Sequence, residues 1–424
     1  MLETLKNAWK VKEIRNKILF TFFIIAIFRI GSVIPVPYIN PDMIATATSD
    51  NSFFSYLSIL TGGGLEYGAI FAMSITPYIN ASIIIQLLCV AIPYLERLSK
   101  EGEEGQKKLA TITRYTTVIL SLIQGVAYFF YLKASSCLSV SGKGAVVFAG
   151  FVIVITFTAG SALVMWLGEQ IDVKGIGNGI SILLFAGILS RGPQAFAALW
   201  TYWTEYDQYF AVIGILVGFL LIIAFIVWMT NAERRIPVQY AKRVVGNKMY
   251  GGQNTHIPIK VNMSGVMPVI FASSILMLPT MILSFKSNTT TSFSKVLALF
   301  STQGVFYAVM YFILIIAFAY FYSTIQFNPV EMANNLRKNG GAIPGIRPGK
   351  PTSDFISKIL SRITLMGALF LSVIAILPII IGSVGKINIS LGGTSVLIMV
   401  GVALDTVQNL ESQMMMRHYK GFLD

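Results

Sequence analysis

The apolar residues of this chain gather into ten long runs separated by polar segments. A helix needs roughly 20 apolar residues to cross the ~30 Å hydrocarbon core of a bilayer. Only 12% of the residues are charged, where soluble domains average about 25%. We therefore predict an all-α polytopic membrane protein with about ten transmembrane helices. The expected spans, of which the fifth is short, are Ile18–Ile34, Ile70–Tyr94, Ile112–Leu132, Val146–Leu167, Ile176–Leu189, Phe210–Thr230, Met263–Leu283, Val305–Phe327, Ile363–Ile381 and Ser395–Leu410.

Lysine and arginine alternate between the two sides of these spans. If the N-terminus lies inside, the inner segments carry 25 of these residues and the outer segments carry 6. Positive charge is enriched on the cytoplasmic side of membrane proteins. Both termini are therefore predicted to be cytoplasmic. The first apolar run has no small-residue cleavage site, so we expect no removable signal peptide.

The spans fall into two sets of five on either side of an outer segment. An odd number of spans in each half gives the halves opposite orientations, as in inverted-repeat membrane folds. We predict an N-terminal half over residues 1–190, an outer hinge loop over 191–208 and a C-terminal half over 209–424.

The apolar stretch over residues 52–88 is interrupted twice. Gly62-Gly63-Gly64 breaks it first, and Thr76-Pro77 breaks it again. Irregular backbone at membrane depth is tolerated only inside protein or beside a water-filled cavity. We expect a short half-helix that folds back, followed by a full helix beside an aqueous path. The glycine-rich segment 175–179 is a weak phosphate-loop signal, and a helix break is the favoured interpretation.

The sequence contains no motif of a familiar enzyme class. It has no GxxxxGK[ST], HExxH, GxSxG or GxGxxG. Cys89 and Cys137 have no CxxC spacing, and His256 and His418 lie far apart. We expect no enzyme activity, no cofactor and no metal site, so a partner or a gradient must supply any energy.

Two features leave alternatives open. Arg29 lies inside the first span, where it either reaches outward as an interfacial anchor or binds carbonyls at a helix break. The cytoplasmic loops 231–261 and 328–362 carry six positive charges each and show no evident secondary structure. They are either ordinary positive-inside segments or, as we favour, docking surfaces for acidic partners such as ribosomal RNA.

Six long segments resemble the SecY family, the channel-forming subunits of the bacterial Sec protein translocase. They are FAMSITPYINASIIIQLL, KEGEEGQKKLATITRYTT, GIGNGISILLFAGI, THIPIKVNMSGVMPVIFASSIL, FNPVEMANNLRKNGGAIPGIRPG and LGGTSVLIMVGVALD. The resemblance implies an hourglass channel in the bacterial cytoplasmic membrane. Such a channel conducts unfolded polypeptides and releases hydrophobic segments sideways into the lipid bilayer. It also implies the partners SecE, SecG, the ATPase SecA, the ribosome, secretory preproteins and nascent membrane proteins.

By position in the matching segments, the resemblance assigns four sets of residues. The pore ring is Ile75, Ile79, Ile180, Leu184, Ile270 and Ile398, with Leu184 in place of the isoleucine often found there. The plug is about residues 51–67, with Gly62, Gly63 and Gly64 as its hinge. The polar cluster of the lateral gate is Gln86, Gln124 and Asn262. The partner-docking residues are Arg234, Arg235, Lys242, Arg243, Lys248, Arg337, Lys338, Arg347 and Lys350.

Two rival functions remain open at the level of sequence. A secondary solute transporter is also built on inverted repeats, but it should carry a cluster of polar ligands near the bilayer midplane. A membrane scaffold or docking receptor would need no conducting path.

Overall fold

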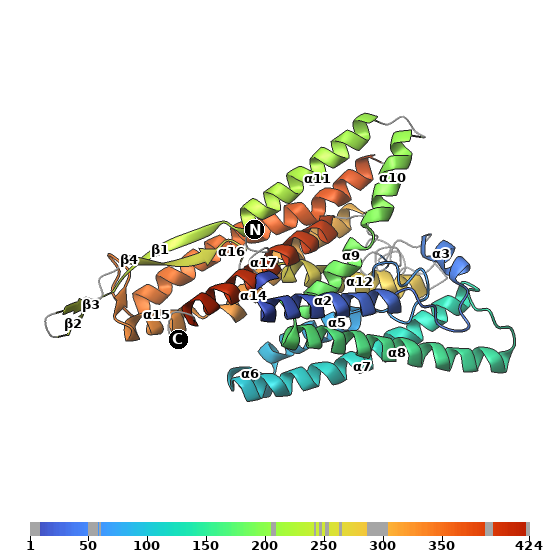
Figure 1. The fold of residues 1–424 in the computed structure, drawn as a ribbon, viewed down its shortest axis with the longest axis horizontal. Helices are drawn as coiled ribbons and strands as arrows, with labels where there is room; N and C mark the ends of the chain where they lie inside the picture. Colours follow the sequence, from blue (N-terminus) through green and yellow to red (C-terminus); the bar gives the residue numbers. More distant parts are fainter. Residues whose placement is uncertain are drawn as a thin grey trace. The chain divides into compact units, whose positions relative to one another are not determined.

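The computed structural model places a helix over each of the ten predicted apolar runs (Figure 1). It describes residues 9–49, 58, 61–204, 209–240, 243–245, 248–250, 254–262, 265–285, 304–385 and 393–420. The all-α class predicted from the apolar runs is confirmed, apart from short strands within residues 233–260 and at Gly341–Ala342.

The chain divides into two compact units. The first covers residues 1–212, 277–302 and 388–424, and the second covers 213–276 and 303–387. The first unit contains α2 (Lys12–Gly31), α3 (Pro41–Ser49), α5 (Thr76–Ala91), α6 (Pro93–Lys100), α7 (Glu103–Ala134), α8 (Lys143–Lys174), α9 (Gly179–Leu189), α10 (Gly192–Thr204) and α17 (Gly393–Lys420). The second contains nearly all of α11 (Tyr209–Thr230), the start of α12 (Met267–Phe285), α14 (Val305–Gln326), α15 (Pro329–Lys338) and α16 (Lys350–Gly385).

These units do not follow the predicted halves, because α17 packs against α9 in the first unit. The two inverted halves stay a prediction. The outer segment 191–208 was expected to be a loop, but helix α10 occupies most of it. Its alanines favour helix and Pro193 lies in the first turn, where proline's missing N–H does no harm.

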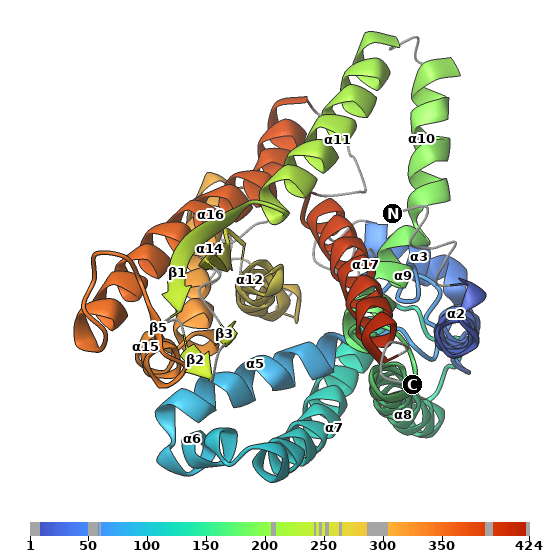
Figure 2. The ribbon, with the colours of Figure 1, turned by 60° about the vertical axis from the view of Figure 1, so that its left-hand side comes forward.

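Six described helices are long and apolar enough to cross a membrane, which makes the chain a multi-pass membrane protein. They are α7, α8, α9 running on into α10, α11, α14 running on into α15, and α16. A seventh candidate is the pair α5 and α6, which bends by 103° (Figure 2). Ile92 is extended in front of Pro93, because proline disfavours helix in the residue before it. For α2, α12 and α17 the predicted spans stay predictions.

The segment after α11 folds into a β-hairpin, so the expectation of a loop without secondary structure is wrong here. Strand β1 (Glu233–Tyr240) pairs antiparallel with β4 (Asn254–Lys260), with Ile236 opposite Ile257. The short strands β2 (Arg243–Val245) and β3 (Lys248–Tyr250) lie beyond them towards the tip (Figure 1). Strand β5 (Gly341–Ala342) joins the other edge of β1, giving the order β4-β1-β5.

A hydrophobic core joins the two predicted cytoplasmic loops into one structure. In β1, Ile236 and Val238 are buried while their neighbours are exposed, which is the period-two pattern of a half-buried strand. They pack with Leu336 of α15 and with Ile343. The buried face of α16 completes this core with Ile356, Leu360 and Ile363. At 1.5 Å per residue, α16 is about 54 Å long, so it can cross a bilayer and still extend beyond it to reach the sheet.

Candidate functional site

The first interruption of the apolar stretch is a tight turn at the predicted hinge glycines. Gly62 and Gly63 have φ angles of +66° and +90°, which side chains rarely adopt. A Cβ atom on Gly62 would lie 2.7 Å from Ser190 Oγ and 2.8 Å from the carbonyl oxygen of Gly187. The turn therefore approaches the end of α9 too closely for any side chain. Most of the predicted plug, residues 51–57, 59 and 60, lies outside the described residues, and the plug role stays a prediction.

After the turn, the chain runs back along the segment that follows α2. The amide of Val36 donates to Gly68 O at 2.9 Å, and the amide of Ile70 donates to Ile34 O at 3.0 Å. Pro35 and Ala69 form an isolated antiparallel bridge. These bonds satisfy backbone groups that would be unpaired in an irregular segment at membrane depth.

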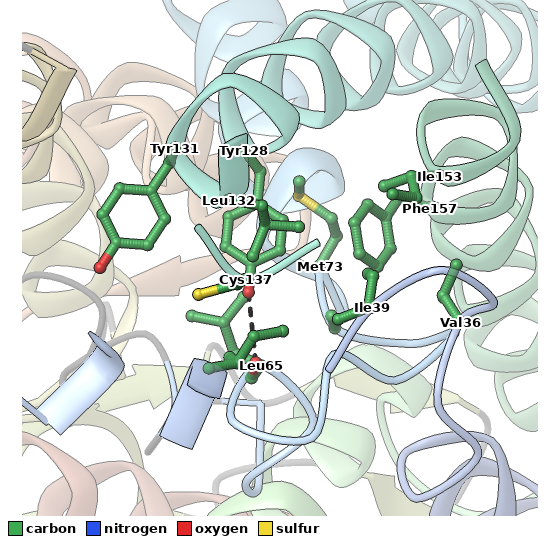
Figure 3. Close-up of a cluster of buried hydrophobic side chains, with 12 residues drawn as sticks. Val36, Ile39, Leu65, Met73, Tyr128, Tyr131, Leu132, Cys137, Ile153 and Phe157 are labelled. Carbon is green, nitrogen blue, oxygen red and sulfur yellow. Dashed lines mark hydrogen bonds between the residues drawn. The ribbon is translucent and has the colours of Figure 1, made fainter. Parts of the chain in front are cut away.

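An apolar cluster fixes this returning segment against α7 and α8 (Figure 3). Leu65 and Met73 pack with Tyr128, Leu132 and Phe157, all of which are buried. The phenol of Tyr128 donates a 3.2 Å hydrogen bond to Leu65 O, drawn as a dashed line in Figure 3. The start of α5 is thus held in position by both packing and backbone bonds.

Arg29 bonds to the backbone break at Gly62. Of its two interpretations, the structure therefore supports carbonyl binding at a break and not an interfacial anchor. Its Nη1 donates to the carbonyl oxygen of Gly62 at 3.1 Å and to Ser190 Oγ at 2.9 Å. The hydroxyl of Ser190 in turn donates to Gly187 O at 2.6 Å. Arg29 therefore connects the last turn of α2 to the glycine turn and to the end of α9.

A second arginine, Arg191, also contacts the chain around the turn and is 9% exposed. Its Nη2 forms a 2.5 Å ion pair with Glu66 and donates to Ser58 Oγ. Sequence reasoning counted Arg191 only among the outer-loop charges. The sequence feature that could have identified Arg191 is its position directly after an apolar run, on the side of the membrane where positive charge is rare.

The predicted pore-ring residues follow the two backbone breaks. Ile75 is buried at the N-terminal boundary of α5, and Ile79 is half-buried one turn later. Ile180 is half-buried in the first turn of α9, and Leu184 is buried one turn on. Asn178 caps α9 by accepting a 3.1 Å bond from Ser181 N, which confirms a helix break in the glycine-rich segment.

The last two ring residues lie on different units. Ile398 is buried in α17, which packs against α9. Ile270 is half-buried in the part of α12 that belongs to the second unit. The structure thus brings five of the six residues into the first unit, and their joint lining of one pore stays a prediction.

The predicted gate residues are likewise divided between the units. Gln86 of α5 is half-buried and donates from Nε2 to Ser82 Oγ in its own helix at 3.3 Å. Gln124 is half-buried on α7, which packs against α5. Asn262 lies in the second unit, where its buried Oδ1 has no hydrogen-bond partner among the residues that the structure describes.

Most of the predicted docking cations lie on the structure formed by the sheet, α15 and the start of α16. Arg234 and Arg235 are exposed on β1, and the latter pairs with Glu233 at 2.6 Å. The other exposed cations of this set are Arg337, Lys338, Arg347 and Lys350. Arg243 and Lys248 lie on β2 and β3, and Lys242 lies outside the described residues. Two loops predicted separately therefore present their charges from one folded structure.

Within the described residues, no group of three or more His, Cys, Asp or Glu could hold a metal ion.

The comparisons with known proteins agree with the resemblance found in the sequence. The sequence model of the SecY family matches residues 69–407, which is most of the chain. The chain belongs to the SecY family. The protein translocase subunit SecY of Thermotoga maritima is 42% identical over 430 residues, covering 100% of this chain and 98% of that protein.

Solved channel structures share the SecY fold with this chain. One, of a SecY protein whose plug domain is described as stabilising the closed channel and maintaining a membrane seal, has a TM-score of 0.64 at 19% identity. It covers 94% of this chain and 92% of the other. Sec61 in the canine ribosome–channel complex has a TM-score of 0.61 at 17% identity, with the same coverage.

Proposed function

We propose that this chain is the passive, protein-conducting channel of a bacterial cytoplasmic membrane. It translocates unfolded polypeptides and releases hydrophobic segments sideways into the bilayer. The observation that carries this proposal is the irregular segment 61–75, which bonds to α2 and to Ser190 at the end of α9 and leads directly into α5. A solute transporter should instead carry a cluster of polar ligands near the bilayer midplane, whereas the six predicted ring side chains are apolar.

The six ring residues form the narrowest part of the path. Each side chain is apolar, and a narrow apolar ring opposes ions because they resist losing their hydration shell. The same ring offers no strong hydrogen-bonding site at which a moving polypeptide would stall. The plug seals the path from the outer side, and Gln86, Gln124 and Asn262 bridge the lateral gate with polar contacts weak enough to separate.

Energy and substrates come from partners on the cytoplasmic side, where both termini lie. SecA or the ribosome docks on the exposed cations of the β1–β4 hairpin and of the α15–α16 connection, including Arg234 and Arg347. The phosphates of ribosomal RNA suit such a surface, and a structural relative of this chain was solved on a ribosome. SecE clamps the two halves, and SecG attaches at the periphery.

Crosslinking a stalled secretory chain tests this proposal. A photoreactive residue is placed at position 75, 79, 180, 270 or 398 in turn, and a matched probe is placed at exposed Phe210, which the channel interpretation leaves outside the pore. Adducts at the five positions and none at Phe210 are expected. Absence of adducts at all five would overturn the channel, and a small solute bound among polar side chains there would favour a transporter.

A further inference from the structure

Helix α10 carries an aromatic side that the described residues leave open. Phe196, Trp200 and Trp203 are four and three residues apart, so they share one side of the helix, and all three are exposed. No lysine, arginine, aspartate or glutamate occurs within Gly192–Thr204. The stripe one position earlier is less exposed and consists of Ala195, Leu199 and Tyr202. One side of α10 is therefore partly covered, whereas its aromatic side is uncharged and uncovered.

The length of the span places this aromatic side at a membrane boundary. Residues Gly179–Thr204 form one candidate span of 26 residues, which is about 39 Å at 1.5 Å per residue. The hydrocarbon core of a bilayer is only about 30 Å thick, so about 20 residues cross it. Counted from Gly179, where α9 begins after the charged end of α8, the core ends near Leu199. Trp200 and Trp203 therefore lie in the headgroup region that follows.

Helix α11 gives the same depth independently. It has 22 residues and is about 33 Å long, so it crosses the hydrocarbon core with little to spare. Few of its residues are buried, which leaves most of the helix free to contact lipid. Its first residue, Tyr209, lies at the boundary opposite Thr230, which leads into the basic strand β1. The ring of Trp203 meets that of Tyr209 edge-on, with the centroids 4.9 Å apart. The two helices thus bring their aromatic ends to one level.

The chemistry of tryptophan suits this level of the bilayer. Its ring is large and apolar while its indole N–H donates a hydrogen bond, so tryptophan is enriched where acyl chains meet headgroups. We propose that the aromatic side of α10 binds the headgroup interface of the bilayer, with Trp200 and Trp203 among the headgroups and Phe196 on the hydrocarbon side. This interface lies at the end of α11 away from β1, which is the outer leaflet in the orientation proposed above. The contact anchors the connection between the two predicted halves at the membrane surface, whether or not the channel conducts.

Fluorescence of single-tryptophan chains tests this contact in the complete channel complex, reconstituted into proteoliposomes. Of the five tryptophans, Trp200 is kept and the others are removed by Trp9→Phe, Trp166→Phe, Trp203→Phe and Trp228→Phe. The matched control is Leu220→Trp in a chain with all five tryptophans replaced by phenylalanine, because Leu220 is 65% exposed in the middle of α11 and Trp200 is 61% exposed. Lipids brominated near the headgroup should quench Trp200 at least about twofold more than lipids brominated near the chain ends, and Leu220→Trp should show the reverse order. The chain without tryptophan is the blank for fluorescence from partner subunits.

Every other quenching pattern overturns the proposal. Quenching of Trp200 by iodide, with none by either brominated lipid, would place α10 in water. Protection from all three quenchers would show that a protein subunit covers the aromatic side, and strongest quenching by the deeper bromines would place Trp200 in the hydrocarbon core. If the Trp200 chain is less stable to heat than the parent, Trp203 is kept in its place, and the same preference for bromines near the headgroup is expected. Failure of the parent to translocate a preprotein would refute the proposed function and leave this result unaffected.

Discussion

Replacing Gly62 by alanine tests whether the turn needs its left-handed backbone and its close approach to α9. The φ angle of +66° at this position is left-handed, and this conformation costs an alanine about 1–2 kcal/mol. The new methyl would also lie 2.8 Å from the carbonyl oxygen of Gly187 and 2.9 Å from Arg29 Nη1. Alanine also reduces the conformational entropy of the unfolded chain, which offsets this cost by only about 0.4–1 kcal/mol. Gly62→Ala should therefore destabilise the closed turn by about 1–3 kcal/mol once the clash is added.

Gly64 supplies a matched control two residues away. Its φ angle is not positive, and a Cβ atom there would find its nearest neighbours at an ordinary 3.5 Å. Gly64→Ala should therefore be neutral or stabilise the protein by up to about 1 kcal/mol. The same methyl group is thus predicted to have opposite effects at two positions of one turn.

Two measurements on the purified channel complex check this prediction. A penalty of about 1–3 kcal/mol multiplies the population of the displaced turn by roughly 5 to 150, so the resting conductance of Gly62→Ala should rise while that of Gly64→Ala stays at the parent level. Thermal unfolding should show a lower midpoint for Gly62→Ala alone. Equal midpoints and equal conductances for the two variants would refute the assigned geometry of the turn.

Three further predictions concern the ring, the docking surface and a buried thiol. Changing several ring residues to serine together should make the resting channel leak ions, and an unchanged conductance in planar bilayers would count against the ring. Arg347→Glu should weaken binding of SecA or ribosomes to membrane vesicles by about tenfold and leave the resting conductance unaltered, because that exposed cation lies in the connection before α16. In a Cys89→Ser background, Cys137 should react slowly with maleimide at neutral pH until the protein unfolds. Burial excludes the reagent and raises the pKa of the Cys137 thiol, which lowers the fraction of reactive thiolate, and rapid labelling of the folded channel would contradict this.

The helices were predictable because apolar run length and proline or glycine breaks depend on local sequence alone. The turn at Gly62 and the capped break at Asn178 follow from the same local chemistry. The β1–β4 hairpin was missed although RIPVQY and HIPIK alternate with a period of two. Its buried partners, Leu336 and Ile356, lie about a hundred residues away, and no local pattern shows that they will cover it.

Long-range polar contacts were the least predictable part of the candidate site. Arg29 was recognised as unusual, but its acceptors at Gly62 and Ser190 lie 33 and 161 residues away. Arg191 was not singled out, because a cation at the end of an apolar run can simply be solvated, and only burial beside Glu66 makes it exceptional. Such pairs depend on how the chain folds back on itself, which residue spacing along one helix does not determine.

Two kinds of contact, apolar packing and a buried ion pair, hold the turn at Gly62 and the chain that follows it. Packing of Leu65 against Tyr128 and Phe157 loses several kcal/mol if it opens, since an emptied apolar site of this kind typically costs about 2–5 kcal/mol. The Arg191–Glu66 pair is largely buried, so the loss of one partner leaves an unpaired charge beside the turn. Breaking the apolar cluster, for example with Leu132→Ala, should therefore lower stability without a selective leak. Glu66→Gln should also lower the thermal unfolding midpoint, because it leaves the largely buried Arg191 without its carboxylate, and an unchanged midpoint would contradict this.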